Sequence, residues 1–362
     1  MQPATPRRRF HPVKATRAFV EQHRLASLIV LGSVLVALAA NMAMYFYNQI
    51  SVTAIDQTVV KKAKPVKYYS PLNGIEVASQ AAASQAVTAV MLENSPDARP
   101  QSGLKQAQVV YEAIAEGGIT RFLCLYQQSK PQLIGPVRSV RMYYVDWLAP
   151  YQAGVAHVGG SAAALAEVRN GNYRDLDQFF NSNSYWRAND RYAPHNVYTS
   201  FEKLDALNQT KGYTTSSFTS FARADGKPAT TPNATKIDIT ISSALFNSHY
   251  DYDAKTNTYL RSQAGAPHTD REDGQISPSV VVALKVNMST VMEDGYREDI
   301  TTTGSGEATV FQNGTATKAT WSKASRSEPL KLTGTDGKEL TLNRGQTWFA
   351  AVPNGSGDVV WQ

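Results

Sequence analysis

The chain has 362 residues, enough for about two folded domains with a sizeable core. Its formal net charge of +6 is unevenly spread: residues 1–24 hold six Lys or Arg against one acid, and the remaining residues hold 30 against 29. This near-neutral remainder lacks the basic surface of a nucleic-acid-binding domain, so we expect no nucleic-acid partner. The only cysteine, Cys124, excludes an intrachain disulfide and a thiolate-rich metal site.

The N-terminal region predicts a membrane anchor. After the basic segment 1–24, the uncharged run LASLIVLGSVLVALAANMAMYFY occupies residues 25–47 and is long enough to cross a bilayer as a helix. Positive charge before the run places the N-terminus in the cytoplasm and the rest outside, in a single-pass plasma-membrane protein. A cleaved signal peptide, with a site at Ala37–Ala39, is the alternative. Both interpretations export the rest of the chain, beginning with a juxtamembrane linker at 48–69.

The exported part divides by composition into two domains. Residues 70–221 alternate strand-like and helix-like patterns, which predicts a mixed α/β (α+β) N-terminal ectodomain. The polar stretch at 222–235, with two prolines and a glycine, is typical of a linker. Residues 236–362 hold short β-type runs separated by turn sequences, which predicts a smaller β-rich C-terminal domain.

One hairpin concentrates charge in the first domain. The sequence VVYEAIAEGGITRFLCLY, at 109–126, predicts two strands joined at the two glycines. In this register Glu112, Ile114 and Glu116 share one face, Ile114 lies opposite Arg121, and Arg121 is diagonal to both carboxylates. Two carboxylates about 13 Å apart along a strand could act as an acid–base pair only by leaning together, so a buried network with Arg121 is the safer interpretation.

The opposite face of this hairpin is expected to be core. It should carry Tyr111, Ala113, Phe122 and Cys124. We therefore expect Cys124 to be a buried thiol and not a nucleophile.

A second concentration of charge follows a Gly-Pro turn. In RSVRMYYVDWLAPY, a predicted helix, Arg138 and Arg141 are three residues apart and share a face. They could pair with Glu112 and Glu116, or they could clamp an anionic ligand such as a carboxylate.

HVGGSAAALAEV places Ser161 at the start of a helix, with His157 before it. An N-cap role for the serine is one interpretation. The other is a polar or anionic ligand bound at the helix start beside His157.

Ala-Pro-His occurs twice. It places His195 beside Asn196 in the first domain, and His268 two residues before Asp270 in the second. Such groups could form a metal or acid–base site, but the histidines lack zinc-site spacing. We expect structural, hydrogen-bonded histidines, no metal and no cofactor.

Several long motifs resemble a known family. NSPDARPQSGLKQAQVVYEAIAEGGITRFLCLYQ, IGPVRSVRMYYVDWL, HVGGS, APHNVY, GAPHTD and LNRGQTWFAAVP are similar to those of the bacterial YerB-like lipoprotein family, over about residues 70–362. The resemblance implies a two-domain extracytoplasmic protein held at the membrane, without agreed catalytic residues. This chain lacks a lipobox cysteine after the apolar run, which leaves the helix as the tether. Polar residues inside the matching motifs are the site candidates: Arg99, Ser102, Glu112, Glu116, Arg121, Arg138, Arg141, His195 and Asn196.

Two functions remain open from the sequence. The first is a membrane-anchored binding or scaffold module of the cell envelope, in which Glu112, Glu116, Arg121, Arg138, Arg141 and His195 line one polar cleft and recognise a glycan, a peptide or a partner protein. The second is an envelope hydrolase that uses Glu112 or Glu116 as acid or base on a glycan or another anionic substrate.

Overall fold

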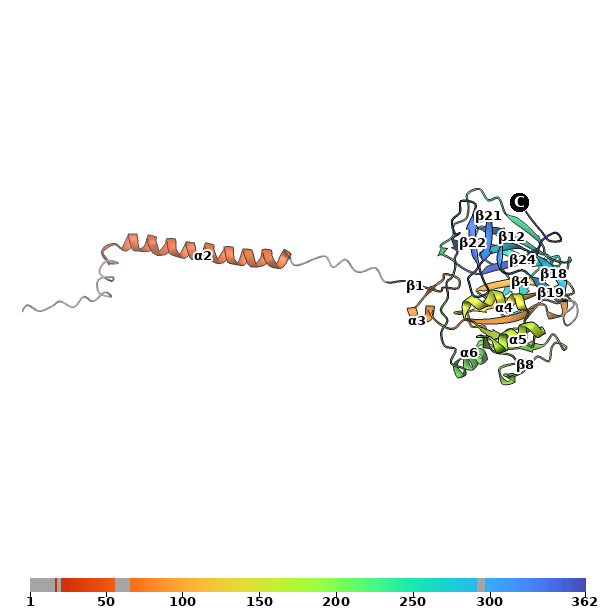
Figure 1. The fold of residues 1–362 in the computed structure, drawn as a ribbon. Coiled ribbons are helices and arrows are strands. Elements are labelled where there is room, and N and C mark those ends of the chain that lie inside the picture. Colours follow the sequence, from red (N-terminus) through yellow and green to blue (C-terminus); the bar gives the residue numbers. More distant parts are fainter. Residues whose placement is uncertain (1–16, 18–20, 56–65, 292–296) are drawn as a thin grey trace, which may run out of the picture. The chain divides into compact units, whose positions relative to one another are not determined.

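A computed structural model describes residues 17, 21–55, 66–291 and 297–362 (Figure 1). The chain divides into two compact units, Met1–Val66 and Lys67–Gln362. In the first unit, helix α2 spans Arg24–Ile55, and its part Arg24–Ile50 is long and apolar enough to cross a membrane. The span predicted at 25–47 lies inside this helix. The predicted basic segment 1–24 falls mostly outside the described residues. The predicted linker 48–69 begins too early, because the helix continues to Ile55, and its residues 56–65 lie outside the described residues.

The second unit is built on a twelve-stranded sheet with the order β22-β21-β20-β17-β24-β4-β5-β3-β6-β7, from which β18 and β19 branch at β4. Its strands from the first half of the unit are β3 (Thr88–Glu93), β4 (Val109–Glu116), β5 (Ile119–Tyr126), β6 (Gly154–Ala156) and β7 (Arg174–Asp175). Those from the second half are β17 (Val280–Val286), β18 (Met288–Val291), β19 (Arg297–Ile300), β20 (Gly304–Gln312), β21 (Thr315–Lys323), β22 (Lys331–Gly334) and β24 (Thr347–Pro353).

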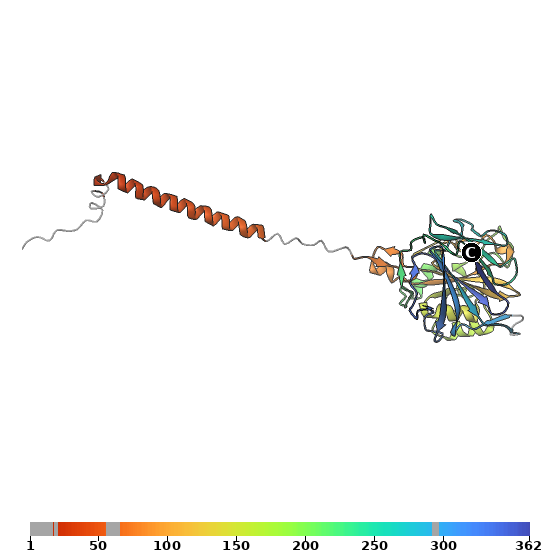
Figure 2. The ribbon, with the colours of Figure 1, turned by 90° about the horizontal axis from the view of Figure 1, so that it is seen from above.

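The two halves meet inside this sheet. Strand β24 pairs in parallel with β4, with Thr347 beside Val109 and Ala350 beside Glu112. In Figure 2 the blue strands of the C-terminal half lie beside the orange and yellow strands of the first half. The segment predicted as a linker, 222–235, follows the surface of the unit, and its strand β10 (Arg223–Ala224) pairs with β23 (Leu342–Asn343). The domain boundary itself stays a prediction, but the sheet crosses it.

Alternating side chains give the large sheet two buried faces, because neighbouring strand residues point to opposite sides. One face carries Tyr111, Leu123 and Phe349 and packs on helix α4 (Met142–Leu148) and its neighbour α5 (Ala162–Asn170). The other face carries core residues that include Val110, Cys124 and Trp348. It packs on helix α6 (Phe201–Thr210).

A second sheet covers the part of this face formed by β17, β20 and β24. Its five strands follow the order β14-β13-β12-β11-β25, and their core includes Ile237, Tyr250 and Tyr259 packed on Val281 and Phe311. Its bounds are β11 (Lys236–Thr240), β12 (Ser248–Asp253), β13 (Thr258–Gln263), β14 (Ala266–Pro267) and β25 (Asp358–Trp361). Short pairs complete the described strands: β1 (Tyr68–Tyr69) with β2 (Glu76–Val77), β8 (Trp186–Arg187) with β9 (Val197–Tyr198), and β15 (Thr269–Asp270) with β16 (Gly274–Gln275).

The predicted fold class is confirmed. Helices α3 (Gln80–Ala83), α4, α5 and α6 all belong to the first half, together with the short 3-10 turns Pro96–Ala98, Ala149–Tyr151 and Ser182–Ser184. From Lys236 onward, the described residues form strands without a helix.

Candidate functional site

The hairpin β4–β5 contains a β-bulge that separates the two predicted acidic partners. Its register shifts between Ile114 and Glu116, so Ile114 lies opposite Thr120 and Glu112 opposite Phe122. The prediction that Ile114 faces Arg121 was therefore wrong. Because the extra residue reverses the alternation, Glu112 and Glu116 point to opposite faces of the sheet.

The same bulge corrects the predicted core face. Tyr111 and Ala113 belong to the core beneath α4, but Phe122 and Cys124 belong to the core on the opposite side. Cys124 is fully buried, as expected, and burial raises the pKa of its thiol well above the ordinary value.

Glu112 makes a buried ion pair with Arg261. The guanidinium donates from Nη2 to both carboxylate oxygens, at 3.1 and 2.9 Å, and the two side chains are 1% and 0% exposed. The indole of Trp348 and the hydroxyl of Thr120 also donate to Glu112, at 2.9 and 3.1 Å. With both oxygens bonded and solvent excluded, Glu112 has no access to a substrate, so the structure opposes its use as an acid or base.

A ring of hydrogen bonds leads back to this pair through His268. Arg261 donates to Nδ1 of His268, whose Nε2 lies 2.9 Å from the side-chain oxygen of Gln101. Gln101 donates to Asn94 at 3.1 Å, and Asn94 donates to Thr120 at 2.6 Å, which closes the ring at Glu112. Burial, and then Arg261, hold the pKa of His268 well below its ordinary value, consistent with a neutral imidazole that accepts at Nδ1.

Glu116 lies on the other face of the sheet, among three arginines. It pairs with Arg121 at 3.0 Å, with Arg297 at 3.3 Å and closely with Arg141. Arg121 also donates to the main-chain oxygen of Ser139. Both oxygens of the Glu116 carboxylate are thus taken up by ion pairs, which leaves this residue poorly placed to act on a substrate.

Arg138 and Arg141 do not share a helix face, so that prediction was wrong. Helix α4 begins at Met142, with Arg141 as its N-cap in an extended conformation. The preceding segment is extended because it bonds to β3: Val137 forms a bridge with Leu92, and the amide of Arg138 donates to Met91. Residues three apart in an extended chain point to opposite sides, so Arg138 reaches Glu93 and Arg141 reaches Glu116.

Arg138 belongs to a third cluster, centred on Glu93 at the end of β3. Its Nε lies 3.3 Å from one oxygen of the Glu93 carboxylate. The other oxygen lies 2.8 Å from Nδ1 of His195 and accepts from the hydroxyl of Ser95 at 2.9 Å. The Glu93 side chain is 5% exposed and that of His195 is 21% exposed. The predicted single cleft therefore separates into three clusters, around Glu112, Glu116 and Glu93.

His195 lines a surface cavity of about 670 Å³, called here the His195 pocket. Nδ1 must carry a proton because it faces a carboxylate oxygen, so Nε2 is the nitrogen left for another partner. The nearest ionic group to Nε2 is Asp97, at 3.9 Å, beyond hydrogen-bond distance. The pocket is lined by Asp97, Arg99, Pro100, Asp190, Arg191, Tyr192, Ala193, His195 and Arg271.

Two arginines of the pocket are held by neutral oxygens. Arg99 donates to the main-chain oxygens of Asn94 and Leu245 and to the side-chain oxygen of Asn94. Arg191 donates to the main-chain oxygen of Asp97 at 2.8 Å. It also donates to the main-chain oxygens of Arg99 and Pro100. Among the described residues neither guanidinium has a carboxylate within 4 Å, unlike Arg271, which pairs with Asp190 at 2.6 Å. Arg99 and Arg191 therefore lack a described ion-pair partner within 4 Å, and the lining as a whole, which also contains Asp97, carries a net charge of +1.

His157 and Ser161 serve the local fold. Ser161 caps α5 by accepting from the amide of Ala164, the N-cap role that was one of the two interpretations. His157 lies between the main-chain oxygen of Gly159, at 2.8 Å, and a carboxylate oxygen of Asp175, at 3.0 Å. Both ring nitrogens are therefore already used.

His157, Asp175 and Asp177 bring ligand-type atoms close enough to hold a metal ion. The carboxylate of Asp177, however, already pairs with Arg169 at 2.8 Å and accepts from main-chain amides. We therefore read this cluster as a charge-paired structural group.

The other predicted site residues also make structural bonds. Ser102 is buried and donates to Glu272, and Asn196 donates to the main-chain oxygens of Ala188 and Arg191. Asp270 accepts from three main-chain amides, at Lys105, Glu272 and Asp273. His268 and Asp270 do not share a site, because their side chains bond to different groups.

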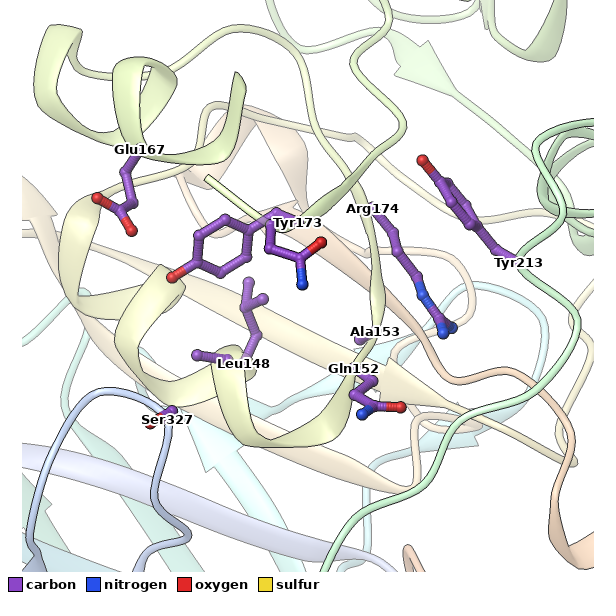
Figure 3. A pocket seen from close by; sticks show the side chains of 10 residues that line it. Leu148, Gln152, Ala153, Glu167, Tyr173, Arg174, Tyr213 and Ser327 are labelled. Atoms are coloured by element: carbon purple, nitrogen blue, oxygen red, sulfur yellow. The ribbon is translucent and has the colours of Figure 1, made fainter. Parts of the chain in front are cut away.

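Another cavity, of about 620 Å³, lies where α5 and β7 meet the loop after β21 (Figure 3). Figure 3 shows Tyr173 and Arg174 between Glu167 and Tyr213. Glu167 pairs with Arg326 at 2.8 Å, and Arg174 donates to the main-chain oxygen of Thr215 at 2.8 Å. None of the predicted site residues lines this cavity.

Sequence reasoning missed Glu93, Asp97, Arg191, Arg261 and Arg271. Glu93 directly precedes the motif NSPDARP and Asp97 lies within it, and a glutamate that ends a buried strand is a signal that could have pointed to them. Arg261 gave no such signal, because it occupies an inward position of a strand that looks polar.

Comparison with known proteins decides the family. The domain described as "Protein of unknown function (DUF3048) N-terminal domain" matches residues 72–214. The corresponding DUF3048 C-terminal domain matches residues 237–349. The chain belongs to the DUF3048 family.

A DUF3048 relative with a similar sequence is "Putative lipoprotein YerB" of Bacillus subtilis (strain 168). It is 34% identical over 296 residues, which cover 80% of this chain and 87% of the relative. The crystal structure of the YerB protein from Bacillus subtilis matches with a TM-score of 0.71 and 30% identity, over 81% of this chain and all of that one. The resemblance to YerB-like proteins is thereby confirmed. These names assign no ligand or reaction, so function must be argued from the geometry.

Proposed function

We propose that this DUF3048 protein is a membrane-anchored binding module of the cell envelope that recognises an anionic ligand in the His195 pocket. The chemistry fits an oxyanion, either the carboxylate of a glycan or peptide or the phosphate of an envelope polymer. The single-pass anchor and the extracytoplasmic position of Lys67–Gln362 are part of this proposal. Support for them comes from the apolar helix α2 and the basic residues before it.

The observation that carries the proposal is the bonding of Arg99 and Arg191. A guanidinium that is bonded only to neutral oxygens keeps its full charge, and burial favours neutralising it with an anion. Burial, and next the charge of Arg261, lower the pKa of Arg99 from its ordinary value, yet an arginine stays protonated at neutral pH. The lining counts three arginines against two aspartates, a net charge of +1.

Binding of inorganic phosphate to the full-length protein in detergent micelles tests the proposal, with equilibrium dialysis of the labelled ion as the measurement. Arg191→Gln removes the charge but keeps an amide that can donate to the same carbonyls, and we expect it to weaken binding about tenfold or more. Lys211→Ala is the matched control, because it removes one positive charge from an exposed residue outside the pocket. Unchanged binding in Arg191→Gln would show that the pocket is not the anion site.

A further inference from the structure

The Glu93–His195 pair has the geometry of a general base and the residue that orients it. Glu93 is buried, and its Oε1 lies 2.8 Å from Nδ1 of His195. The Nδ1–H donates to this oxygen, which leaves the lone pair of the ring on Nε2. The guanidinium of Arg138 adds a positive charge beside this pair, with its Nε 3.3 Å from the other oxygen of Glu93. The ring lines the same cavity as Arg99 and Arg191, neither of which has a carboxylate of the described residues within 4 Å. A basic nitrogen therefore faces the space where an anion would bind.

A serine nucleophile does not fit this arrangement. Ser95 lies 3.2 Å from Nδ1 of His195, the same nitrogen that Glu93 occupies, and donates its hydroxyl proton to Glu93. In a catalytic triad the serine and the acid would face different ring nitrogens. The group that Nε2 can activate is therefore a water molecule.

We infer that the His195 pocket hydrolyses phosphodiesters, with His195 as the general base on the attacking water and Glu93 as its positioning residue. This inference rests on the proposed anion site. In a phosphodiester the anionic group is also the reacting group, so guanidiniums that hold its oxygens stabilise the charge that builds up during attack. A diester carries one negative charge, which matches the net charge of +1 in the lining.

The reaction balances without another reactant. Nε2 removes a proton from water as the oxygen forms a bond to phosphorus. The bond from phosphorus to the leaving oxygen on the opposite side breaks, that oxygen takes a proton from solvent, and the imidazolium releases its proton to solvent. One diester and one water thus give a phosphomonoester and an alcohol, and His195 ends neutral.

The test uses the full-length protein in detergent micelles with bis(p-nitrophenyl) phosphate as the substrate. We expect the wild type to release nitrophenol, and His195→Ala to be at least about 100-fold slower, the usual contribution of a general base. Free imidazole should restore part of the rate of His195→Ala, which a purely structural histidine would not allow. Lys211→Ala should match the wild type.

Phosphate binding, measured on the same samples, separates this inference from the proposed function. Wild-type protein that binds phosphate but releases no nitrophenol would overturn the hydrolysis and leave the binding module intact. Equal rates in wild type and His195→Ala would also overturn it. Protein that does neither would overturn both proposals. Phosphate binding retained by His195→Ala, together with the lost rate, is the result that supports the inference.

Discussion

At the scale of single residues, the notable feature is a fully buried charge pair. Glu112 and Arg261 are excluded from solvent, and each is bonded on several sides. Arg261 also packs over the ring of Trp348, 4.6 Å from its centroid. Removing two charges from water is costly, so such a pair survives only when every donor and acceptor is satisfied. We therefore regard this pair as architecture that joins the second sheet to β4.

Removing one partner of this pair should destabilise the protein far more than removing both. Arg261→Met leaves Glu112 unpaired in the core, and we expect a loss of about 3–5 kcal/mol in the free energy of unfolding. The double variant Arg261→Met with Glu112→Leu should lose clearly less. Urea unfolding followed by tryptophan fluorescence measures both. Lys331→Ala, which breaks an exposed pair with Glu339, is the control and should change nothing measurable.

A loss below about 1 kcal/mol in Arg261→Met would contradict this assignment. It would mean that water reaches Glu112, and the carboxylate would again become a candidate for chemistry.

At the scale of elements, the bulge in β4 depends on helix α4. A bulge interrupts the strand ladder and leaves main-chain groups in need of partners. The hydroxyl of Tyr143 donates to the main-chain oxygen of Ile114 at 2.7 Å, next to the irregularity. Tyr144 donates to the oxygens of Ala113 and Arg121 at 3.1 and 2.7 Å. The helix thus supplies the bonds near the point where the two strands lose their regular register.

Tyr143→Phe should therefore destabilise the protein without creating a cavity. We expect the free energy of unfolding to fall by about 1–2 kcal/mol, because the carbonyl of Ile114 stays buried and loses its donor. The measurement is again the urea midpoint. Tyr192→Phe, at an exposed tyrosine whose hydroxyl has no described hydrogen bond, is the matched control. Equal midpoints for the two variants would show that water replaces the lost hydroxyl.

At the scale of the whole molecule, two sequence-defined domains share one sheet. The parallel pairing of β24 with β4 places strands from both DUF3048 domains side by side. The charge pair of Glu112 and Arg261 crosses between the same two domains. The His195 pocket also draws on both, with Arg191 from the first and Arg271 from the second. A ligand bound there would contact both domains at once.

The orientation of the chain is open to a direct test. Protease added to intact cells should degrade Lys67–Gln362 and spare an N-terminal tag, because basic residues before an apolar span stay in the cytoplasm. Immunoblots against tags at both ends give the result, and a cytoplasmic protein serves as the control for lysis. Protection of the C-terminal tag in intact cells would remove the basis for an envelope ligand.

The sequence by itself determined the parts that depend on local pattern. The apolar run at 25–47 sets a helix long enough to cross a membrane, and alternation in 109–126 sets two buried strands and a buried Cys124. The Ser161 cap is local in the same sense, because its acceptor and donor are three residues apart. Each of these features depends on neighbours in the chain, so the pattern is sufficient.

Only the tertiary structure decided which charges meet. The bulge before Glu116 is one extra residue, and it places Glu112 and Glu116 on opposite faces of the sheet. This shift depends on the pairing of the whole strand and not on any short motif. Glu112 pairs with Arg261, which is 149 residues away in the sequence, and Glu93 pairs with His195, which is 102 residues away. Because a charge is stabilised by whatever the fold brings within a few ångströms, partners so distant in sequence cannot be read from spacing. The composition of the His195 pocket therefore follows from the shared sheet and its connecting loops.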